Sequence, residues 1–243
     1  MNLLAINTCT RRVSVAIAID GEPTAESLVL ESALAAGEGS PRHVEELAPA
    51  IKRLLRASAI TARDIDVVAV TVGPGMFTGL RVGMSTACTF AGALGLPMIA
   101  LSSLEVLADP LQTADCDAVV PVLDARRAEL YFAVYTRGAL GFETSAECDI
   151  ATPGALADVL AARGGRLLLC GDALNRYPNE FAHLPNVAVA ASEFSQASCT
   201  SLVRVAHSKW QLGSAVEVSQ VVPVYLRQSD AEINVAKVSG GTM

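Results

Sequence analysis

The sequence predicts an α/β protein built from two related lobes. Short apolar runs typical of strands alternate with amphipathic stretches at helical spacing. A strand, a turn with two arginines and a second strand occur over residues 3–17, and the same pattern returns over residues 119–135. Because this match is one of pattern rather than identity, it suggests two copies of one ancestral unit. Apolar residues make up 51% of the chain, which supplies a core for both copies.

The first half contains five predicted strands and two predicted helices. The strands are expected at residues 3–6, 13–19, 26–30, 66–72 and 98–101. The first helix starts near Ser40 and Pro41, a favourable N-cap and first helical residue. Its apolar stripe comprises Val44, Leu47, Ala48, Ile51, Leu54 and Leu55. The second helix is expected over residues 78–94, directly after a glycine-rich break.

The second half repeats the opening hairpin with strands at residues 119–123 and 130–135. We expect helices at 153–162 and 199–211 and a strand at 166–170. A polar run between residues 102 and 117 separates the halves. The predicted division is an N-terminal lobe over residues 1–102 and a C-terminal lobe over 103–243, whose last segment can pack back on the first lobe.

Composition narrows the classes of function. The formal net charge of −7 repels a phosphate backbone, so binding of nucleic acid by this chain alone is not expected. None of the six cysteines forms a CxxC pair, and we interpret them as buried, reduced thiols of a reducing compartment. The first residues lack the pattern of a signal peptide, and no apolar run has the length of a membrane span. We therefore expect a cytoplasmic protein.

The glycine-rich segment over residues 73–79 follows a strand and opens a helix. Backbone N–H groups in that position can hold an anion. The alternative is a tight turn that needs glycine for its backbone angles. The segment lacks the Gly-Lys-Ser/Thr of a P-loop, so the turn is the favoured interpretation.

The helix after this segment carries a small residue at every fourth position. These are Gly79, Gly83, Ala87 and Ala91. They share one face and let another backbone approach closely. Glycine inside a helix costs about 1 kcal/mol of stability relative to alanine, so the presence of two glycines on one face requires an explanation. Two explanations remain open: packing against the chain's own first helix, or a subunit interface formed by both helices.

No catalytic residue is predicted from the motifs. His43 is the only histidine beside carboxylates, and at a helix start it is more typical of a surface or capping residue. No serine lies in a Gly-x-Ser-x-Gly elbow. Residues 124–127, Asp-Ala-Arg-Arg, can be read as a substrate loop, but a solvated hairpin turn is the simpler interpretation.

Four stretches of the chain resemble the TsaB (YeaZ) proteins. They lie at residues 3–10, 73–83, 124–131 and 223–227, in the expected order over nearly the whole chain. The stretch PGMFTGLR is the most specific of them. The resemblance implies an actin-like ATPase (ASKHA, RNase H-like) fold with two related lobes. It also implies a part in the threonylcarbamoyl (t6A) modification of adenosine 37 in tRNAs that read ANN codons.

In that family the subunit is not the catalyst. It binds and activates the catalytic paralogue TsaD, with the ATPase TsaE joining the assembly, and tRNA is reached only through the complex. The resemblance implies pairing through the two helices of the first lobe, here by Leu47, Ile51, Leu54, Gly79, Gly83, Ala87 and Ala91. A homodimer is expected when the chain is alone. The chain is expected to have no cofactor or metal of its own, with ATP or ADP held only within the complex.

Three departures bear on catalysis. The catalytic paralogue carries a His-x-x-x-His metal pair where this chain has Ser103 and Leu107, so we expect no metal centre. Asn7 replaces the usual aspartate, and its amide lacks the charge that attracts Mg²⁺. Met76 stands where serine is common. The main alternative function is an actin-like-fold ATPase or small-molecule kinase, for which Asp124 leaves room; a peptidase finds no support in the motifs.

Overall fold

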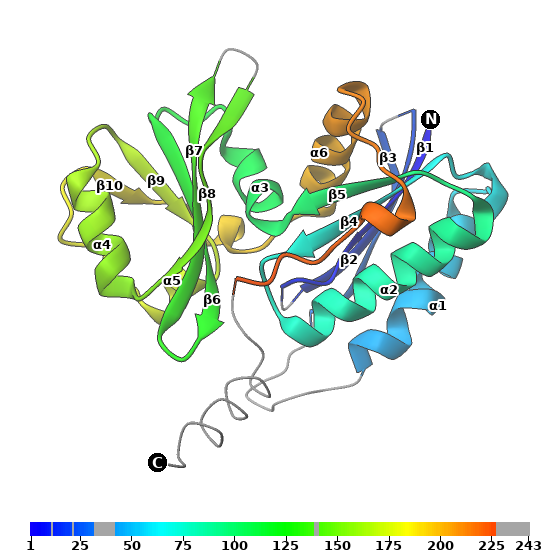
Figure 1. The fold of residues 1–243 in the computed structure, drawn as a ribbon, viewed down its shortest axis with the longest axis horizontal. Helices are drawn as coiled ribbons and strands as arrows, with labels where there is room; N and C mark the ends of the chain where they lie inside the picture. Colours follow the sequence, from blue (N-terminus) through cyan, green and yellow to red (C-terminus); the bar gives the residue numbers. More distant parts are fainter. Residues whose placement is uncertain (11, 21, 32–41, 139–140, 227–243) are drawn as a thin grey trace, which may run out of the picture.

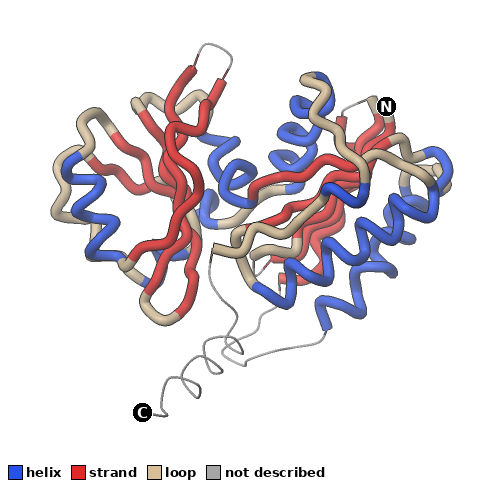
Figure 2. The backbone as a smooth tube through the Cα atoms, viewed as in Figure 1, coloured by secondary structure: helices blue, strands red, loops and turns tan. Residues whose placement is uncertain are grey.

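The computed structural model describes residues 1–226 apart from residues 11, 21, 32–41, 139 and 140. Two five-stranded sheets stand beside each other, each with helices against it (Figures 1 and 2). The first sheet contains β1 (Asn2–Asn7), β2 (Arg12–Ile19), β3 (Glu22–Glu31), β4 (Val67–Gly73) and β5 (Met98–Ser102). The second contains β6 (Ala118–Arg126), β7 (Glu129–Gly138), β8 (Gly141–Ala151), β9 (Leu167–Cys170) and β10 (Val187–Val189).

The two sheets have the same topology. The strand order is β3-β2-β1-β4-β5 in the first sheet and β8-β7-β6-β9-β10 in the second. In each, the first three strands pair antiparallel as a meander, and the last two add in parallel on the other side. This duplicated order confirms the two related lobes expected from the repeated hairpin, and it is the order of the actin-like fold.

Helices cover both faces of the first sheet. On one face α1 (Arg42–Ala57) and α2 (Phe77–Leu94) lie side by side, as Figure 1 shows, and bury a cluster that includes Leu4, Ile6 and Val70. On the other face α6 (Cys199–Gln211) packs against β1, β2 and β3. Among the described residues, no helix has both the length and the apolar character needed to cross a membrane.

The position of α6 modifies the predicted division at residue 102. The sequence-based boundary assigns this helix to the second lobe, whereas its apolar residues lie in a cluster with Leu3, Ala5 and Ile99 of the first sheet. One side of this helix is apolar, and its residues Leu202, Val203 and Ala206 are buried where the sheet covers them. The second lobe in three dimensions therefore consists mainly of residues 118–189.

The remaining helices belong to the second lobe and to the junction. α4 (Pro153–Ala162) and α5 (Ala173–Arg176) pack on one face of the second sheet. α3 (Ser103–Ala108) contacts β4 and β5 on one side and β6 and β7 on the other, so it forms a wedge between the lobes. Short 3-10 turns are present at Ala62–Asp64, Asp109–Leu111, Ser192–Ser195 and Val218–Gln220.

Candidate functional site

The glycines at the start of α2 let this helix approach the end of β1 very closely. A Cβ atom added to Gly79 would lie 2.1 Å from the carbonyl oxygen of Thr8, and one on Gly83 would lie 2.0 Å from Thr8 Oγ1. A Cβ on Gly75 would lie 2.2 Å from the carbonyl oxygen of Cys9. No side chain fits at Gly75 or Gly79, where the neighbour is backbone, and at Gly83 the Thr8 side chain would have to shift to admit one.

The small-residue face of α2 therefore points into its own lobe. Ala87 and Ala91 have no solvent exposure, and Gly83 is buried. Leu47, Ile51 and Leu54 of α1 are 5% exposed or less and belong to the same core cluster.

This arrangement corrects the list of residues that the sequence suggested for a subunit interface. Five of the seven, Leu47, Ile51, Leu54, Ala87 and Ala91, are core residues of the first lobe, and Gly79 and Gly83 lie against Thr8, so internal packing accounts for all of them. The helices themselves still offer other faces to a partner. Contact of these two helices with a partner thus stays a prediction, and the exposed described residues of both helices lie outside that list.

The outer faces of α1 and α2 are accessible to solvent. On α2 the exposed positions are Phe77, Thr78, Arg81, Ser85, Thr89, Gly92 and Ala93, which are mostly small and uncharged. On α1 the described exposed positions after the first turn are Ala48, Pro49, Lys52, Arg53, Arg56 and Ala57. A surface of small side chains next to a basic helix can receive another helix at short distance.

A buried polar network lies where β1 ends. Asn7 is 1% exposed, and its Oδ1 accepts hydrogen bonds from the Cys9 backbone N–H at 3.1 Å and from Thr71 Oγ1 at 3.0 Å. The Cys9 thiol donates to Thr71 Oγ1 at 3.1 Å. Asn7 Nδ2 has no partner among the described residues. The amide is thus a structural element of the core, which holds the turn after β1 against β4.

One backbone N–H of the glycine-rich segment is used within the chain. The backbone N–H of Met76, at the N-terminus of α2, donates to the carbonyl oxygen of Cys9 at 2.8 Å. One of the donors that would face an anion is therefore used within the chain. This agrees with the interpretation of residues 73–79 as a turn, in which Gly73 has a φ of +107°.

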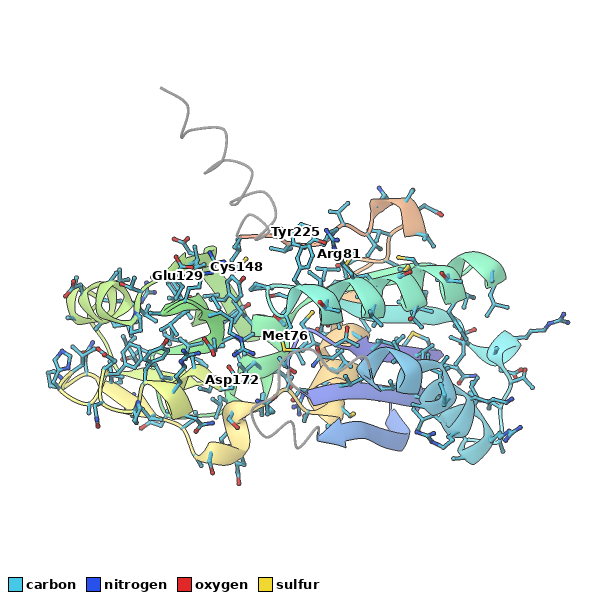
Figure 3. The ribbon with its side chains drawn as sticks, turned by 90° about the horizontal axis from the view of Figure 1, so that it is seen from below. Met76, Arg81, Glu129, Cys148, Asp172 and Tyr225 are labelled. Atoms are coloured by element: carbon cyan, nitrogen blue, oxygen red, sulfur yellow. The ribbon has the colours of Figure 1, made fainter. Side chains whose placement is uncertain are left out.

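A small cleft that opens to solvent lies between the lobes. It is lined by Cys9, Thr10, Gly75 and Met76 from the first lobe and by Leu123, Asp124, Arg126 and Asp172 from the second. Figure 3 shows Met76 and Asp172 near this junction, from opposite sides. The groups that line this cleft decide whether it suits a magnesium-nucleotide complex.

The acidic residues of the cleft already have partners. Asp124 Oδ2 accepts from Arg176 Nη1 at 2.9 Å, and its Oδ1 accepts from the Arg126 backbone N–H at 2.9 Å. Asp172 Oδ1 accepts from the Asp124 backbone N–H at 3.1 Å. With Asn7 in place of an aspartate, and with Asp124 and Asp172 bonded within the chain, the described residues of the cleft do not fit a magnesium-nucleotide site by themselves.

Asp124 instead organises the hairpin turn between β6 and β7. Three consecutive residues there, Arg126, Arg127 and Ala128, have positive φ angles. The hydrogen bond from the Arg126 N–H to Asp124 supports this strained backbone. The arginine side chains are exposed, in agreement with a solvated turn.

Ser103 and Leu107 are buried at the positions expected to lack metal ligands. Ser103 has no exposure and donates a hydrogen bond from Oγ to the carbonyl oxygen of Pro74. Leu107 is 1% exposed and packs in an apolar cluster with Leu104 and Val119. Among the described residues there is no group of three or more His, Cys, Asp or Glu side chains arranged to hold a metal ion. The serine joins the wedge helix α3 to the glycine-rich loop.

The six cysteines are free thiols, and four of them, Cys9, Cys116, Cys170 and Cys199, are buried, as the sequence indicated. Burial raises the pKa of the Cys9 thiol to about 11 and that of Cys170 to about 12. Both are therefore protonated at neutral pH, and neither is an activated nucleophile.

Two side-chain groups were missed by sequence reasoning. Arg204 of α6 binds the carboxylate of Asp109, which is 1% exposed, with Nε 2.9 Å from Oδ2. Arg81 of α2 donates from Nε to the hydroxyl of Tyr225 at 3.0 Å. Both pairs join residues about a hundred positions apart or more, which no local pattern reveals. The only available signal was that Arg81 and Tyr225 each belong to a stretch shared with a known family.

Comparisons with known proteins agree on the relationship of this chain. Residues 37–235 match the family model described as "TsaD: tRNA N6-adenosine threonylcarbamoyltransferase". The chain is 28% identical to the tRNA threonylcarbamoyladenosine biosynthesis protein TsaB of Escherichia coli K12, over 95% of this chain and 96% of that protein. It is 31% identical to TsaB of Bacillus subtilis, over 56% of this chain and 55% of that protein.

Among solved structures, YeaZ from Pseudomonas aeruginosa superposes with a TM-score of 0.76 at 25% identity, covering 93% of this chain and 99% of that chain. The agreement thus extends from the sequence to the arrangement of both lobes. The chain belongs to the TsaB (YeaZ) family, within the wider group that the TsaD family model describes.

Proposed function

We propose that this chain is the non-catalytic subunit of a cytoplasmic tRNA threonylcarbamoyltransferase complex, which binds and activates a catalytic TsaD paralogue. The observation that carries the proposal is the chemistry at Ser103 and Leu107. By the resemblance, a hydroxyl bonded to Pro74 and a buried leucine stand where the catalytic paralogue has a metal pair; leucine cannot ligate a metal, and serine is a poor ligand.

The cleft supports the same proposal. Asn7, Asp124 and Asp172 are held by hydrogen bonds or an ion pair within the chain, which leaves the lobe junction poorly suited to hydrolysing ATP. In the proposal, ATP or ADP is held only where the partner contributes to the site. TsaE and tRNA are reached through the complex rather than by this acidic chain alone.

The outer faces of α1 and α2 are the proposed contact surface for the paralogue. Their small, uncharged side chains on α2 allow close helix packing, and Lys52 and Arg56 of α1 favour a partner surface with acidic residues. In the absence of the paralogue, a second copy of this chain is the expected occupant. Sedimentation at several protein concentrations tests this homodimer.

The central experiment is reconstitution of tRNA threonylcarbamoylation from purified paralogue and TsaE, with and without this chain. The proposal predicts product only when this chain is present. Ser85→Arg, on the exposed face of α2, should weaken the paralogue complex by roughly thirtyfold or more, because a long charged side chain prevents close approach. The matched control is Ala161→Arg, which places the same side chain at an exposed position of α4 in the other lobe; this variant should bind the paralogue normally.

Titration of the chain alone with Mg-ATP separates this proposal from the ATPase or kinase alternative. The proposal predicts no turnover and weak binding at most. Tight binding with hydrolysis by the chain alone would favour the alternative, for which the two cleft aspartates are the supporting observation.

A further inference from the structure

The last described residues of the chain return to the first lobe. Val216 forms an antiparallel bridge with Met98 of β5, with N–H to O distances of 2.8 and 2.9 Å. Farther on, the Val224 N–H donates to the carbonyl oxygen of Val72 in β4 at 2.7 Å. Figure 1 shows this segment, in orange, running beside β4 and α2. The segment is therefore attached to the sheet at two points.

Three exposed side chains attach the same segment to α2. Arg81 Nε donates to the Tyr225 hydroxyl at 3.0 Å, and the Arg81 guanidinium carbon lies 3.8 Å above the centre of the Phe77 ring. The Phe77 and Tyr225 ring centres are 5.4 Å apart. Figure 3 shows Arg81 and Tyr225 beside each other. We call these three residues, Phe77, Arg81 and Tyr225, the C-terminal clasp.

The clasp lies where α2 is weakly held by its own sequence. The N-cap residue Met76 provides no side-chain hydrogen bond, and the first turn contains no acidic residue to complement the helix dipole. At the same place the Val224 carbonyl oxygen lies only 2.9 Å from where a Cβ on Gly73 would be. The C-terminal segment thus crosses the start of the glycine-rich loop, and the clasp joins it to the turn that follows.

We propose that Arg81 and Tyr225 are positioning residues, which hold the first turn of α2 in the conformation that the paralogue binds. This proposal rests on the proposed function, because it concerns the first turn of α2, one of the two helices that are proposed to contact the paralogue. Without the clasp, the first turn frays and the crossing segment separates from β4. The paralogue then has to order both before it can bind, so affinity falls. Because Tyr225 lies outside α1 and α2, Tyr225→Phe tests this effect without altering the outer faces of the two helices.

Hydrogen exchange of two amides tests the clasp directly. The Leu80 N–H donates to Met76 in the first turn of α2, and the Val224 N–H donates to Val72. Tyr225→Phe removes the hydroxyl and keeps the ring. It should raise exchange at both amides by about threefold to tenfold, the effect of one lost hydrogen bond. The Leu156 N–H in α4 serves as an internal reference and should not change.

Tyr177→Phe is the matched control. Tyr177 also lies beside an arginine, Arg176, with 5.6 Å between the guanidinium carbon and the ring centre, but in the other lobe. It should change neither amide. Affinity for the purified paralogue should fall about threefold to tenfold in Tyr225→Phe and stay constant in Tyr177→Phe.

A double variant separates positioning from general stability. If Arg81 acts through Tyr225, then Arg81→Met combined with Tyr225→Phe weakens paralogue binding no more than the stronger single change. Additive losses, unchanged exchange in Tyr225→Phe, or faster exchange with unchanged affinity would each overturn the proposal. Failure of the unaltered chain to bind the paralogue would instead refute the proposed function, and the exchange rates would still decide whether the clasp holds α2.

Discussion

Gly79 and Gly92 lie on the same helix and lead to opposite predictions when each is replaced by alanine. A Cβ on Gly79 would lie 2.1 Å from the Thr8 carbonyl oxygen, whereas one on Gly92 would meet nothing within 4 Å. Both changes remove the cost of glycine in a helix, about 1 kcal/mol. Only Gly79→Ala also creates a collision, and its partner is a backbone atom that cannot rotate away.

The size of the effect follows from that distance. Ordinary contact begins near 3.4 Å, so α2 would have to move away from β1 by roughly 1.3 Å. Overpacking of this kind costs about 1–3 kcal/mol, and more when backbone must move. We expect Gly79→Ala to lower the free energy of unfolding by about 2 kcal/mol net, and Gly92→Ala to raise it by about 0.5 kcal/mol.

Thermal or urea unfolding of the two variants measures this difference. For a chain of this size, 1 kcal/mol corresponds to about 2–4 °C in Tm, so the Gly79 variant should melt about 4–8 °C lower. If Gly79→Ala were as stable as Gly92→Ala and lost only partner binding, the small-residue face would be an external docking surface. The internal packing described for α2 would then be refuted.

Three further predictions concern buried polar groups. Asn7→Asp should destabilise the fold by about 1–3 kcal/mol at pH 7, because a buried carboxylate replaces an amide whose Nδ2 has no partner among the described residues. Burial favours the neutral acid, so the folded state takes up a proton at a higher pH than the unfolded chain does, and urea unfolding should show a smaller loss at pH 5. Burial raises the pKa of the Cys9 thiol to about 11 from 9.0, so the thiol of the unfolded chain loses its proton at a lower pH than that of the folded chain. The free energy of unfolding should therefore fall as the pH rises from 9 towards 11, and Cys9→Ser should make it less dependent on pH in this range. Arg204→Met leaves the buried carboxylate of Asp109 without its cation and should cost about 3 kcal/mol by calorimetry, with partial recovery when Asp109→Asn is added.

Local patterns predicted most of the framework of the fold but missed the strand β8 (Gly141–Ala151) and the smallest elements. The helices at Pro153–Ala162 and Cys199–Gln211 agree with prediction because their caps and apolar spacing are strong. Helix α3 was missed because it is apolar on nearly all sides, as a wedge between two sheets must be. β10 has three residues, too few for any period to be recognised.

The sequence patterns did not identify which residues contact each other at the candidate site. A stripe of small residues indicates that some backbone comes close, but it carries no information on which backbone that is. In this chain it is the end of β1, at Thr8, seventy positions upstream. The clasp between Arg81 and Tyr225 spans 144 positions, so only the tertiary structure brings the two together.

The placement of α6 has a consequence for how this chain is made. The sheet face that carries Leu3 and Ala5 is synthesised before the second lobe, yet its cover, residues 199–211, is synthesised after that lobe. The second lobe, whose strands all lie within residues 118–189, has its own helix cover earlier. We therefore expect the lobe at the C-terminal end to be complete on the nascent chain before the lobe at the N-terminal end, the reverse of the usual vectorial order.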